Sequence, residues 1–408
     1  MQWLSRVSVN EIVDAPILTP SDEAPASSDL AVMLTGGGAR AAYQVGLLAG
    51  LARHFPHLRF QVITGVSAGA INASFLAAAE GTLPEKVERL VEMWCALQVE
   101  HIFRFDFRRL LPFRSAMASM FPKKRWRRTG GLLDTTPLRR LLRRVLGTRD
   151  RGAIDGIKRN LRNGDIKAVA LTTLDYSTGQ TVRWVQGRNV DVFEGPNRRS
   201  VRTELTLDHV MASAALPFVF PAVSIGNEWH GDGGIRLAAP LSAAVHLGAA
   251  RILAMSTGYQ RTPEEADHPV VQGYPPTGQI ISQLVNAVFL DVIDEDVARM
   301  ERMNEMIRKM PEDDRNGFRP IDLCVLRPSL DLGVLAAEYE RYLPRRIKFI
   351  TRALGAKETE SPDFVSLLMF EPNYMQRLVD LGIHDVEQRL DELQLFLGDS
   401  ARPALTAV

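Results

Sequence analysis

Short apolar runs alternate with helix-like stretches in the first part of the chain. The run DLAVMLTGGG at 29–38 is continuously apolar before it ends in glycines, which is typical of a strand buried on both faces. Small and apolar residues at helical spacing follow at 39–55. FQVITG at 60–65 repeats the strand pattern, and a second small-residue helix is expected at 67–81. Strand, glycine turn and helix, twice in succession, predict a doubly wound α/β sheet.

The later parts of the chain mix both patterns. Residues 164–187 are typical of two strands joined by a turn. One long helix is predicted over 279–310, and Pro311 ends it. A last strand is expected within 319–329, and 364–398 has the pattern of amphipathic helices. Because neither an internal repeat nor a clear linker separates these segments, we expect one large domain.

Composition narrows the class of protein. With 46% hydrophobic and 24% charged residues, the 408-residue chain has the balance of a soluble globular protein. A net charge of +1 gives no indication of nucleic-acid binding. Two cysteines exclude a disulfide framework, and their neighbours match no metal or redox motif, so neither a metal nor a cofactor is expected. The first 28 residues lack an apolar core of the secretory type, and no apolar run approaches about 18 residues. We therefore expect a flexible arm at 1–28 and a cytoplasmic protein, either free or peripheral to a membrane.

Ser67 lies in GVSAGA at 65–70, with the G-x-S-x-G spacing of a nucleophile on a sharp turn from strand to helix. Gly65 and Gly69 suit such a turn because a Cβ at either place would collide with neighbouring backbone. Ala68 opens the helix, whose N-terminal amides can stabilise negative charge. The spacing also occurs by chance in tight turns. Here it follows a strand-like run and opens a helix, so Ser67 is the predicted nucleophile.

A second glycine turn precedes this one by one strand and one helix. Gly36, Gly37 and Gly38 leave backbone N–H groups unshielded, so that an oxyanion could be held by several donors. Arg40 places a positive charge at the start of a helix, where the helix dipole disfavours it. A cation in that position indicates that an anion pairs with it. We therefore predict an oxyanion hole at this loop.

A dinucleotide-binding loop is the alternative, because Gly36, Gly38 and Ala41 loosely satisfy G-x-G-x-x-G/A. That motif requires an acidic residue about twenty positions later, for the ribose hydroxyls. Between 55 and 81 the only acid is Glu80. The Lys-Ser/Thr pair of a phosphate-binding loop is also missing. Nucleotide binding is therefore disfavoured.

Asp232, in HGDGG at 230–234, is the candidate base for the serine. A carboxylate there could accept the serine proton directly, while Gly233 and Gly234 donate backbone N–H groups to orient it. His230 lies two residues away and could share the same strand face, and a role for it stays open. The alternative for Asp232 is an ordinary turn aspartate.

Four segments together resemble the patatin-like phospholipases, and they occur in that family's order between about residue 30 and residue 240. They are VMLTGGGARAAYQVGLLAGL at 32–51, ITGVSAGAINA at 63–73, MASAALPFVFPAV at 211–223 and HGDGG at 230–234. The segment at 366–386 also looks like the C-terminal part of bacterial members.

The resemblance implies a three-layer α/β/α fold with a mainly parallel central sheet, and a Ser–Asp dyad without a catalytic histidine. Ser67 would then be the nucleophile and Asp232 the base, with Gly36, Gly37, Gly38 and Arg40 as the oxyanion loop. It implies a serine lipid acyl hydrolase that releases fatty acid from phospholipid or other acyl esters through an acyl-enzyme. The alternative is a catalytically silent or partner-activated protein of the same fold that binds lipid or protein. The expected layout is the arm at 1–28, a catalytic domain at 29–330 and a helical extension at 331–408 packed on the same domain.

A basic segment at 104–151 interrupts the pattern, with fifteen Lys and Arg against three acids. Its interleaved Phe and Leu residues and Trp126 would suit peripheral contact with an anionic membrane. The alternative is a solvated, Arg-rich cap over an acyl pocket. Nucleic-acid binding is disfavoured, because no reader motif accompanies the cations.

Overall fold

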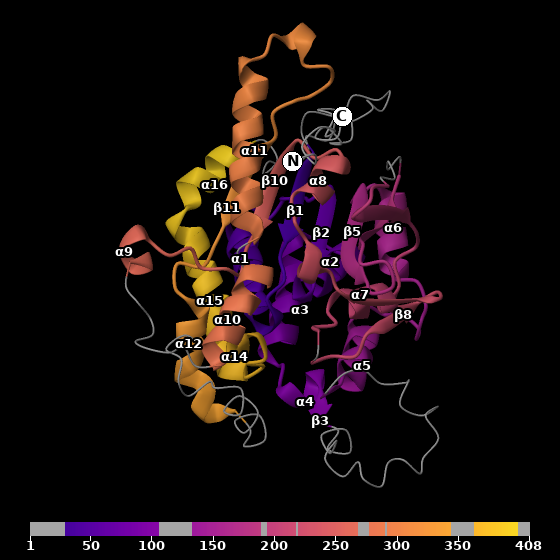
Figure 1. Ribbon diagram of the computed structural model, residues 1–408, viewed down its shortest axis with the longest axis vertical. Coiled ribbons are helices and arrows are strands. Elements are labelled where there is room, and N and C mark those ends of the chain that lie inside the picture. The colour runs from indigo at the N-terminus through magenta and orange to yellow at the C-terminus, as the bar shows by residue number, and fades with distance from the viewer. Residues whose placement is uncertain are drawn as a thin grey trace, which may run out of the picture.

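In the computed structural model the described residues are 29–105, 133–188, 194–217, 219–267, 277–289, 292–343 and 363–398. They form one nine-stranded sheet with helices on both faces (Figure 1). The strand order is β11-β10-β1-β2-β5-β6-β7, with β9 paired to β5 and β8 paired to β9. The strands are β1 Leu30–Leu34, β2 Val62–Val66, β5 Ala168–Asp175, β6 Thr181–Gly187, β7 Arg198–Arg202, β8 Val223–Ile225, β9 Glu228–Asp232, β10 Arg251–Met255 and β11 Asp322–Leu326. A separate two-stranded sheet pairs β3 Arg104–Phe105 with β4 Leu133–Asp134.

The helices fill the sequence between the strands. They are α1 Ala41–His54, α2 Ala68–Ala78, α3 Leu83–Cys95, α4 Val99–Ile102, α5 Thr136–Val145, α6 Asp155–Asn163, α7 Leu207–Ser213, α8 Ser242–His246, α9 Pro263–Ala266, α10 Thr277–Phe289, α11 Val292–Lys309, α12 Leu332–Tyr339, α14 Asp363–Leu367, α15 Pro372–Gln388 and α16 Leu390–Leu397. No helix in these stretches is both long and apolar enough to cross a bilayer.

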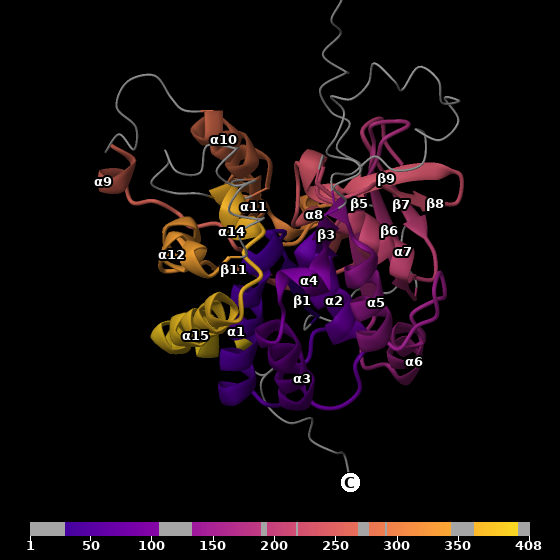
Figure 2. The same ribbon diagram turned by 90° about the horizontal axis from the view of Figure 1, so that it is seen from below.

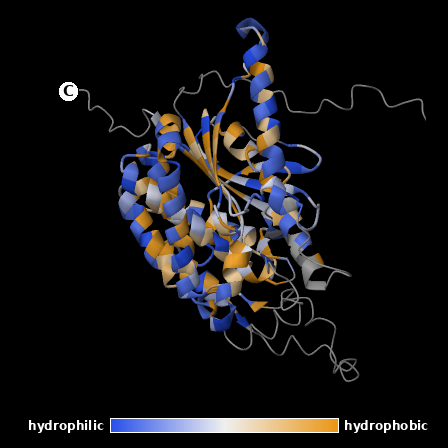
Figure 3. Ribbon diagram, turned by 90° about the vertical axis from the view of Figure 1, so that its left-hand side faces the viewer, coloured by the Kyte–Doolittle hydropathy of each residue, from blue (hydrophilic) through white to orange (hydrophobic). Residues whose placement is uncertain are grey.

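The sheet is mainly parallel, as the βαβ pattern predicts. β1 runs parallel to both β2 and β10, and β2 runs parallel to β5. Among the described strands of this sheet, the antiparallel pairs are β5 with β6, β5 with β9 and β8 with β9. β1 and β2 are buried at every position, because helices cover both faces. Figure 3 shows these central strands as the apolar centre of the molecule.

Alternate residues of β1 belong to different layers of the core. Leu30, Val32 and Leu34 pack in the apolar cluster that includes α1, α2 and α15. Ala31 and Met33 pack in a second cluster, with residues of α8 and α11. Because successive side chains of a strand point to opposite faces, these two clusters lie on opposite sides of the sheet. The predicted three-layer α/β/α fold with a mainly parallel sheet is confirmed.

The C-terminal helix α15 packs directly on α1 (Figures 1 and 2). A Cβ on Gly382 would lie 2.4 Å from the carbonyl oxygen of Tyr43, so glycine permits the close approach of the two helices. The Tyr43 hydroxyl donates a hydrogen bond to Asp385 Oδ2 at 2.8 Å. The end of the chain is thus packed against the helix that follows the first glycine turn.

Two expectations are only partly covered by the described residues. Within the single long helix expected over 279–310, the described residues form α10 and α11, and residues 290–291 between them lie outside the described residues. Helix α10 contacts α14 and the turn after β9, and α11 packs against the sheet. The expected arm at 1–28 and residues 106–132 of the basic segment lie outside the described residues.

Candidate active site

Ser67 occupies the sharp turn between β2 and α2. Its φ and ψ of 55° and −130° are unusual for a residue with a side chain, and such strain is typical of functional turns. A Cβ on Gly65 would lie 2.6 Å from the carbonyl oxygen of Gly69, and one on Gly69 would lie 2.3 Å from that of Leu34. Both glycines are therefore required by close packing. Ala68 begins α2, as the motif predicts.

Ser213, at the end of α7, holds this turn in place. Its hydroxyl accepts the Ser67 backbone N–H at 3.0 Å and donates to the carbonyl oxygen of Thr172 at 2.7 Å. The side chain is completely buried, so it satisfies a donor that water cannot reach. Sequence reasoning missed this residue, although it lies within the MASAALPFVFPAV segment.

The sheet register brings Asp232 to Ser67. β2 lies along one edge of β5 and its last pair is Val66 with Thr172. β9 runs in the opposite direction along β5, and its last pair is Asp232 with Thr173. The other edge of β5 carries β6, so β2 and β9 share one edge and their carboxyl ends meet. Residues far apart in sequence thus become neighbours.

The two side chains form a direct hydrogen bond. Ser67 Oγ donates to Asp232 Oδ2 at 2.6 Å, and the Gly234 N–H donates to Asp232 Oδ1 at 2.8 Å. Asp232 is completely buried. Burial raises the pKa of its carboxyl group to about 7, although the hydrogen bonds from Ser67 and Gly234 act in the opposite direction. A carboxyl group with this pKa can both accept and return a proton near neutral pH.

The glycine loop after β1 lies beside Ser67. A Cβ on Gly36 would lie 3.0 Å from the Ser67 Cβ. Gly37 and Gly38 have φ of 144° and 55°, and both line the same pocket as Ser67. Thr257, which follows β10, fixes the loop because its Oγ1 donates to the Gly36 carbonyl oxygen at 2.5 Å.

Arg40 is buried under this loop, at 1% exposure. Its guanidinium pairs with Asp363 of α14, and its Nε donates to Ser366 Oγ at 2.5 Å. Its backbone N–H donates to the carbonyl oxygen of Gly37 at 3.0 Å. The anion that this cation meets therefore lies in the chain itself, and Arg40 ties the glycine loop to the C-terminal segment. A direct part for Arg40 in the oxyanion hole stays a prediction.

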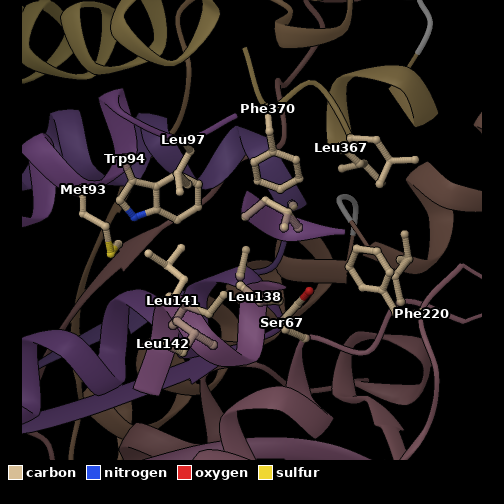
Figure 4. A pocket seen from close by; sticks show the side chains of 18 of the residues that line it. Ser67, Met93, Trp94, Leu97, Leu138, Leu141, Leu142, Phe220, Leu367 and Phe370 are labelled. Carbon is tan, nitrogen blue, oxygen red and sulfur yellow. The ribbon is translucent and has the colours of Figure 1, made fainter. Parts of the chain in front are cut away.

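An apolar pocket opens at Ser67. Figure 4 shows the serine hydroxyl among the side chains of Phe220, Leu367 and the leucines of α5. The cavity volume is about 50 Å³, far below the range of about 300–1,000 Å³ usual for small-molecule sites, so a ligand of ordinary size would have to part the lining side chains. The lining residues are Gly37, Gly38, Ser67, Ala68, Ile71, Met93, Trp94, Leu97, Ile102, Leu138, Leu141, Leu142, Ala214, Leu216, Phe220, Phe289, Leu367, Leu368 and Phe370.

His230 contacts side chains of β5 and β6. Its Nδ1 lies 3.3 Å from Thr173 Oγ1, and its ring packs edge-on against Trp184 with centroids 5.3 Å apart. Burial lowers the pKa of the imidazole, which favours the neutral ring. These contacts make His230 part of the packing between β5, β6 and β9.

Asp175, Glu228 and His230 have ligand atoms within 4.8 Å of one another, close enough to hold a metal ion. Arg199 already places a cation there, because its Nη2 lies 2.6 Å from Glu228 Oε2 and 3.6 Å from Asp175 Oδ2. The carboxylates are thus compensated by a side chain, and the cluster joins β5, β7 and β9.

The chain is similar to solved structures of other proteins at low sequence identity. No curated protein sequence matches it. The crystal structure of VipD from Legionella pneumophila is 13% identical, with a TM-score of 0.35, and the match covers 90% of this chain and 67% of that one. Human GIVD cytosolic phospholipase A2, in complex with methyl gamma-linolenyl fluorophosphonate, is 14% identical with a TM-score of 0.40, and the match covers 92% of this chain and 60% of that one.

A match to a family model assigns the chain to a protein family. The model described as patatin-like phospholipase matches residues 32–245, which is more than half of the 408 residues. This stretch contains both glycine loops, Ser67 and Asp232. The chain belongs to the patatin-like phospholipase family.

Proposed function

We propose that the protein is a serine lipid acyl hydrolase that uses Ser67 and Asp232 as a catalytic dyad. Family membership supports lipid hydrolase activity. The observation that carries the finer assignment is the 2.6 Å hydrogen bond from Ser67 Oγ to Asp232 Oδ2, formed where an apolar pocket opens.

The proposed first step is acylation of the serine. Asp232 Oδ2 takes the proton from Ser67 Oγ as the oxygen attacks the ester carbonyl carbon. The carbonyl oxygen becomes an oxyanion, which the N–H groups of Gly37 and Gly38 and the N-terminus of α2 stabilise. Asp232 then returns the proton to the leaving alcohol, and the C–O bond of the ester breaks.

Deacylation repeats this sequence with water. Asp232 takes a proton from a water molecule as the water oxygen attacks the carbonyl carbon of the acyl-enzyme. The same N–H donors stabilise the second oxyanion. Ser67 leaves with the proton and a fatty acid is released. A histidine is not needed, because the raised pKa of Asp232 gives the carboxylate the basicity that the proton transfers require.

The proposed substrate is an acyl ester of a phospholipid or a neutral lipid. The pocket is lined almost entirely by apolar side chains, which suits a hydrocarbon chain. Its polar groups lie at the serine and the glycine loop, where the ester would be placed.

We extend the proposal to peripheral contact with anionic lipid through the described end of the basic segment. Helix α5 turns Leu138 and Leu142 into the core and the pocket, while Arg140, Arg143 and Arg144 are exposed. One helix thus has an apolar face for an acyl chain and a cationic face for anionic headgroups. The cap and the membrane-contact interpretations are therefore compatible for α5.

Labelling with a fluorophosphonate probe tests the proposed activity. We expect the wild-type protein to be labelled and to hydrolyse acyl esters, and both signals to be lost in Ser67→Ala with the circular dichroism spectrum unchanged. Near-normal turnover by Ser67→Ala would refute the assignment of the nucleophile. An unlabelled, inactive wild-type protein would favour the catalytically silent alternative.

A further inference from the structure

Helix α10 presents an apolar stripe to solvent. Ile280 and Leu284 are 43% and 62% exposed, and Ala287 is exposed as well. Their spacing of four and three residues places them on one face of the helix. Gln283, which is also exposed and uncharged, borders this stripe. Apolar side chains that are contiguous on a surface indicate a site of interaction with a protein or a membrane.

The whole of this helix is free of charged side chains. Its thirteen residues, TGQIISQLVNAVF, include no Asp, Glu, Lys or Arg, although 24% of the chain is charged. Other exposed apolar side chains lie on different kinds of helix. Met306 is on α11, VIDEDVARMERMNEMIRK, and Leu395 is on α16, LDELQLFL. Helix α10 can therefore leave water without the large cost of desolvating an ion.

The opposite face of α10 is attached to the proposed active site. The Phe289 ring packs on the base loop, where a Cβ on Gly234 would lie 2.7 Å from Phe289 Cδ1. Phe289 also lines the pocket that opens at Ser67. Asn286 Nδ2 donates to Asp363 Oδ2 at 2.7 Å, and Asp363 also holds the arginine of the glycine loop. The apolar stripe is therefore kept beside the pocket.

Helix α5 lines the same pocket. Its Leu138, Leu141 and Leu142 contribute to the lining together with Phe289 of α10, and Figure 1 shows both helices in the lower half of the molecule. The exposed arginines of α5 carry positive charge. A surface that contacted both helices would therefore meet cations at α5 and an apolar stripe at α10. Anionic headgroups above a hydrocarbon layer suit this combination.

We propose that α10 is a membrane-contact helix, whose Ile280, Leu284 and Ala287 enter the boundary between the headgroups and the acyl chains of a lipid bilayer. The proposal rests on the proposed lipid substrate, and it adds an apolar contact to the ionic contact proposed for α5. Amphipathic helices bind about 5–10 Å into this boundary. The contact places the pocket at Ser67 next to the acyl chains of the substrate.

The first experiment locates α10 relative to the bilayer. Leu284→Trp and Leu395→Trp each add one indole at an exposed position, on α10 and on α16. Both are made in the full chain carrying Ser67→Ala, so that lipid binding is measured without hydrolysis. The vesicles contain phosphatidylcholine and phosphatidylglycerol, with brominated acyl chains as quenchers. We expect the added fluorescence of Leu284→Trp to fall by about half or more, and that of Leu395→Trp to stay unchanged.

The second experiment measures how much the stripe strengthens binding. At about 0.5 M sodium chloride the ionic contacts of α5 are screened, whereas the apolar contact remains. We expect vesicle binding at this salt to weaken about tenfold or more in Leu284→Asp and in Ile280→Asp, because a charge then has to leave water. Leu395→Asp should bind as the parent does. All three positions are exposed, and circular dichroism verifies that each variant is folded.

Kinetics separate this proposal from the proposed function. In the chain that retains Ser67, hydrolysis of vesicle lipid by Leu284→Asp should fall about tenfold more than hydrolysis of a soluble short-chain ester. If the wild-type protein hydrolyses neither substrate, the proposed function fails. The quenching of Leu284→Trp then still decides whether α10 contacts lipid, because that measurement requires no turnover.

Three results would overturn the proposal. One is a parent protein that does not bind the vesicles at either salt concentration. Another is equal quenching of Leu284→Trp and Leu395→Trp, or equal vesicle binding by Leu284→Asp and Leu395→Asp. The third is a Leu284→Asp variant that keeps its vesicle binding but sediments as a smaller species than the parent. That result would assign the stripe to contact with a second copy of the chain.

Discussion

Asp232 is completely buried at the end of β9, and a carboxyl group in that place releases its proton less readily than in water. The strand register determines this burial, because it places Asp232 next to Ser67 and away from solvent. Its hydrogen bonds from Ser67 and Gly234 keep the carboxylate oriented but do not offset the burial. The chemistry of the proposed dyad therefore depends on the burial of one side chain.

The pH dependence of turnover follows from this burial. As the base, Asp232 must be ionised, and its pKa is about 7. We expect kcat/KM for a soluble ester to rise about tenfold per pH unit below pH 7 and to level off above it. Rates measured from pH 5 to 9 check this. A profile that is level down to pH 5 would contradict the role of Asp232 as a base with a raised pKa.

Stability should depend on pH with the opposite sign. Because the folded pKa lies above that of the unfolded chain, Asp232 favours the folded state at low pH, and this contribution is lost as the pH rises from about 4 to 7. Asp232→Asn cannot ionise. Its free energy of unfolding, relative to wild type, should therefore increase by a few kcal/mol across that range. Urea unfolding at several pH values measures this difference, and a difference that is constant with pH would refute it.

Ser213 is a positioning residue for the nucleophile. In Ser213→Ala the Ser67 N–H stays buried without an acceptor, at a cost of about 1–3 kcal/mol. We expect kcat to fall roughly ten- to hundredfold, with little change in KM, because the strained turn loses its support. Ser74→Ala is the control, since the Ser74 hydroxyl is equally buried and has no hydrogen-bond partner among the described residues. Equal kinetics of the two variants would exclude the positioning role.

At the scale of the element, helix α5 joins the basic segment to the pocket. Its sequence TPLRRLLRRV places leucines on one side and arginines on the other, as an amphipathic helix does. The leucines reach the pocket that opens at Ser67. The length of acyl chain accepted should therefore be sensitive to side-chain size on this helix.

Leu141→Trp tests this sensitivity. Leu141 is half-buried and lines the pocket, so a larger ring there should fill space that a long acyl chain needs. We expect the rate with a long-chain ester to fall about tenfold or more while the rate with an acetate ester changes little. Arg140→Trp, at an exposed position of the same helix, should leave both rates unchanged. An equal loss of rate with both esters would contradict this, because it would indicate damage to the catalytic residues rather than a shortened acyl-chain pocket.

At the scale of the whole molecule, the C-terminal segment takes part in building the site. Asp363 and Ser366 of α14 hold Arg40, and α15 packs on α1. Helix α14, which lies within the helical extension predicted at 331–408, thus supports the glycine loop through Arg40. We expect loss of this support to affect both folding and turnover.

Asp363→Asn should be strongly destabilising, by about 3–5 kcal/mol, because it leaves the buried Arg40 without a carboxylate. Glu387→Gln is the matched control. Glu387 of α15 pairs with Arg53 of α1 at 3.8 Å, and both side chains are exposed, so its loss should cost less than about 1 kcal/mol. Urea unfolding compares the two variants, and equal stability would show that the buried pair does not hold the segments together.

Local sterics made much of this site predictable. The turn at Ser67 needs small neighbours at 65 and 69, and the loop after β1 adopts positive φ at Gly37 and Gly38, so each turn is visible as glycines after an apolar run. The burial of β1 at every position likewise follows from a continuously apolar run. These features depend on residues within a few positions of one another, and for that reason they can be predicted from the order of residues.

The contacts between distant segments could not be predicted in this way. The meeting of β2 and β9 on one edge of β5, the Ser213 hydroxyl at the Ser67 N–H and the pairing of Arg40 with Asp363 each depend on strand order and register. Order along the chain therefore specifies the turns and the kinds of reactive group. Packing of the sheet selects the partner of each group and the degree of its burial, because burial and pairing are properties of the assembled layers.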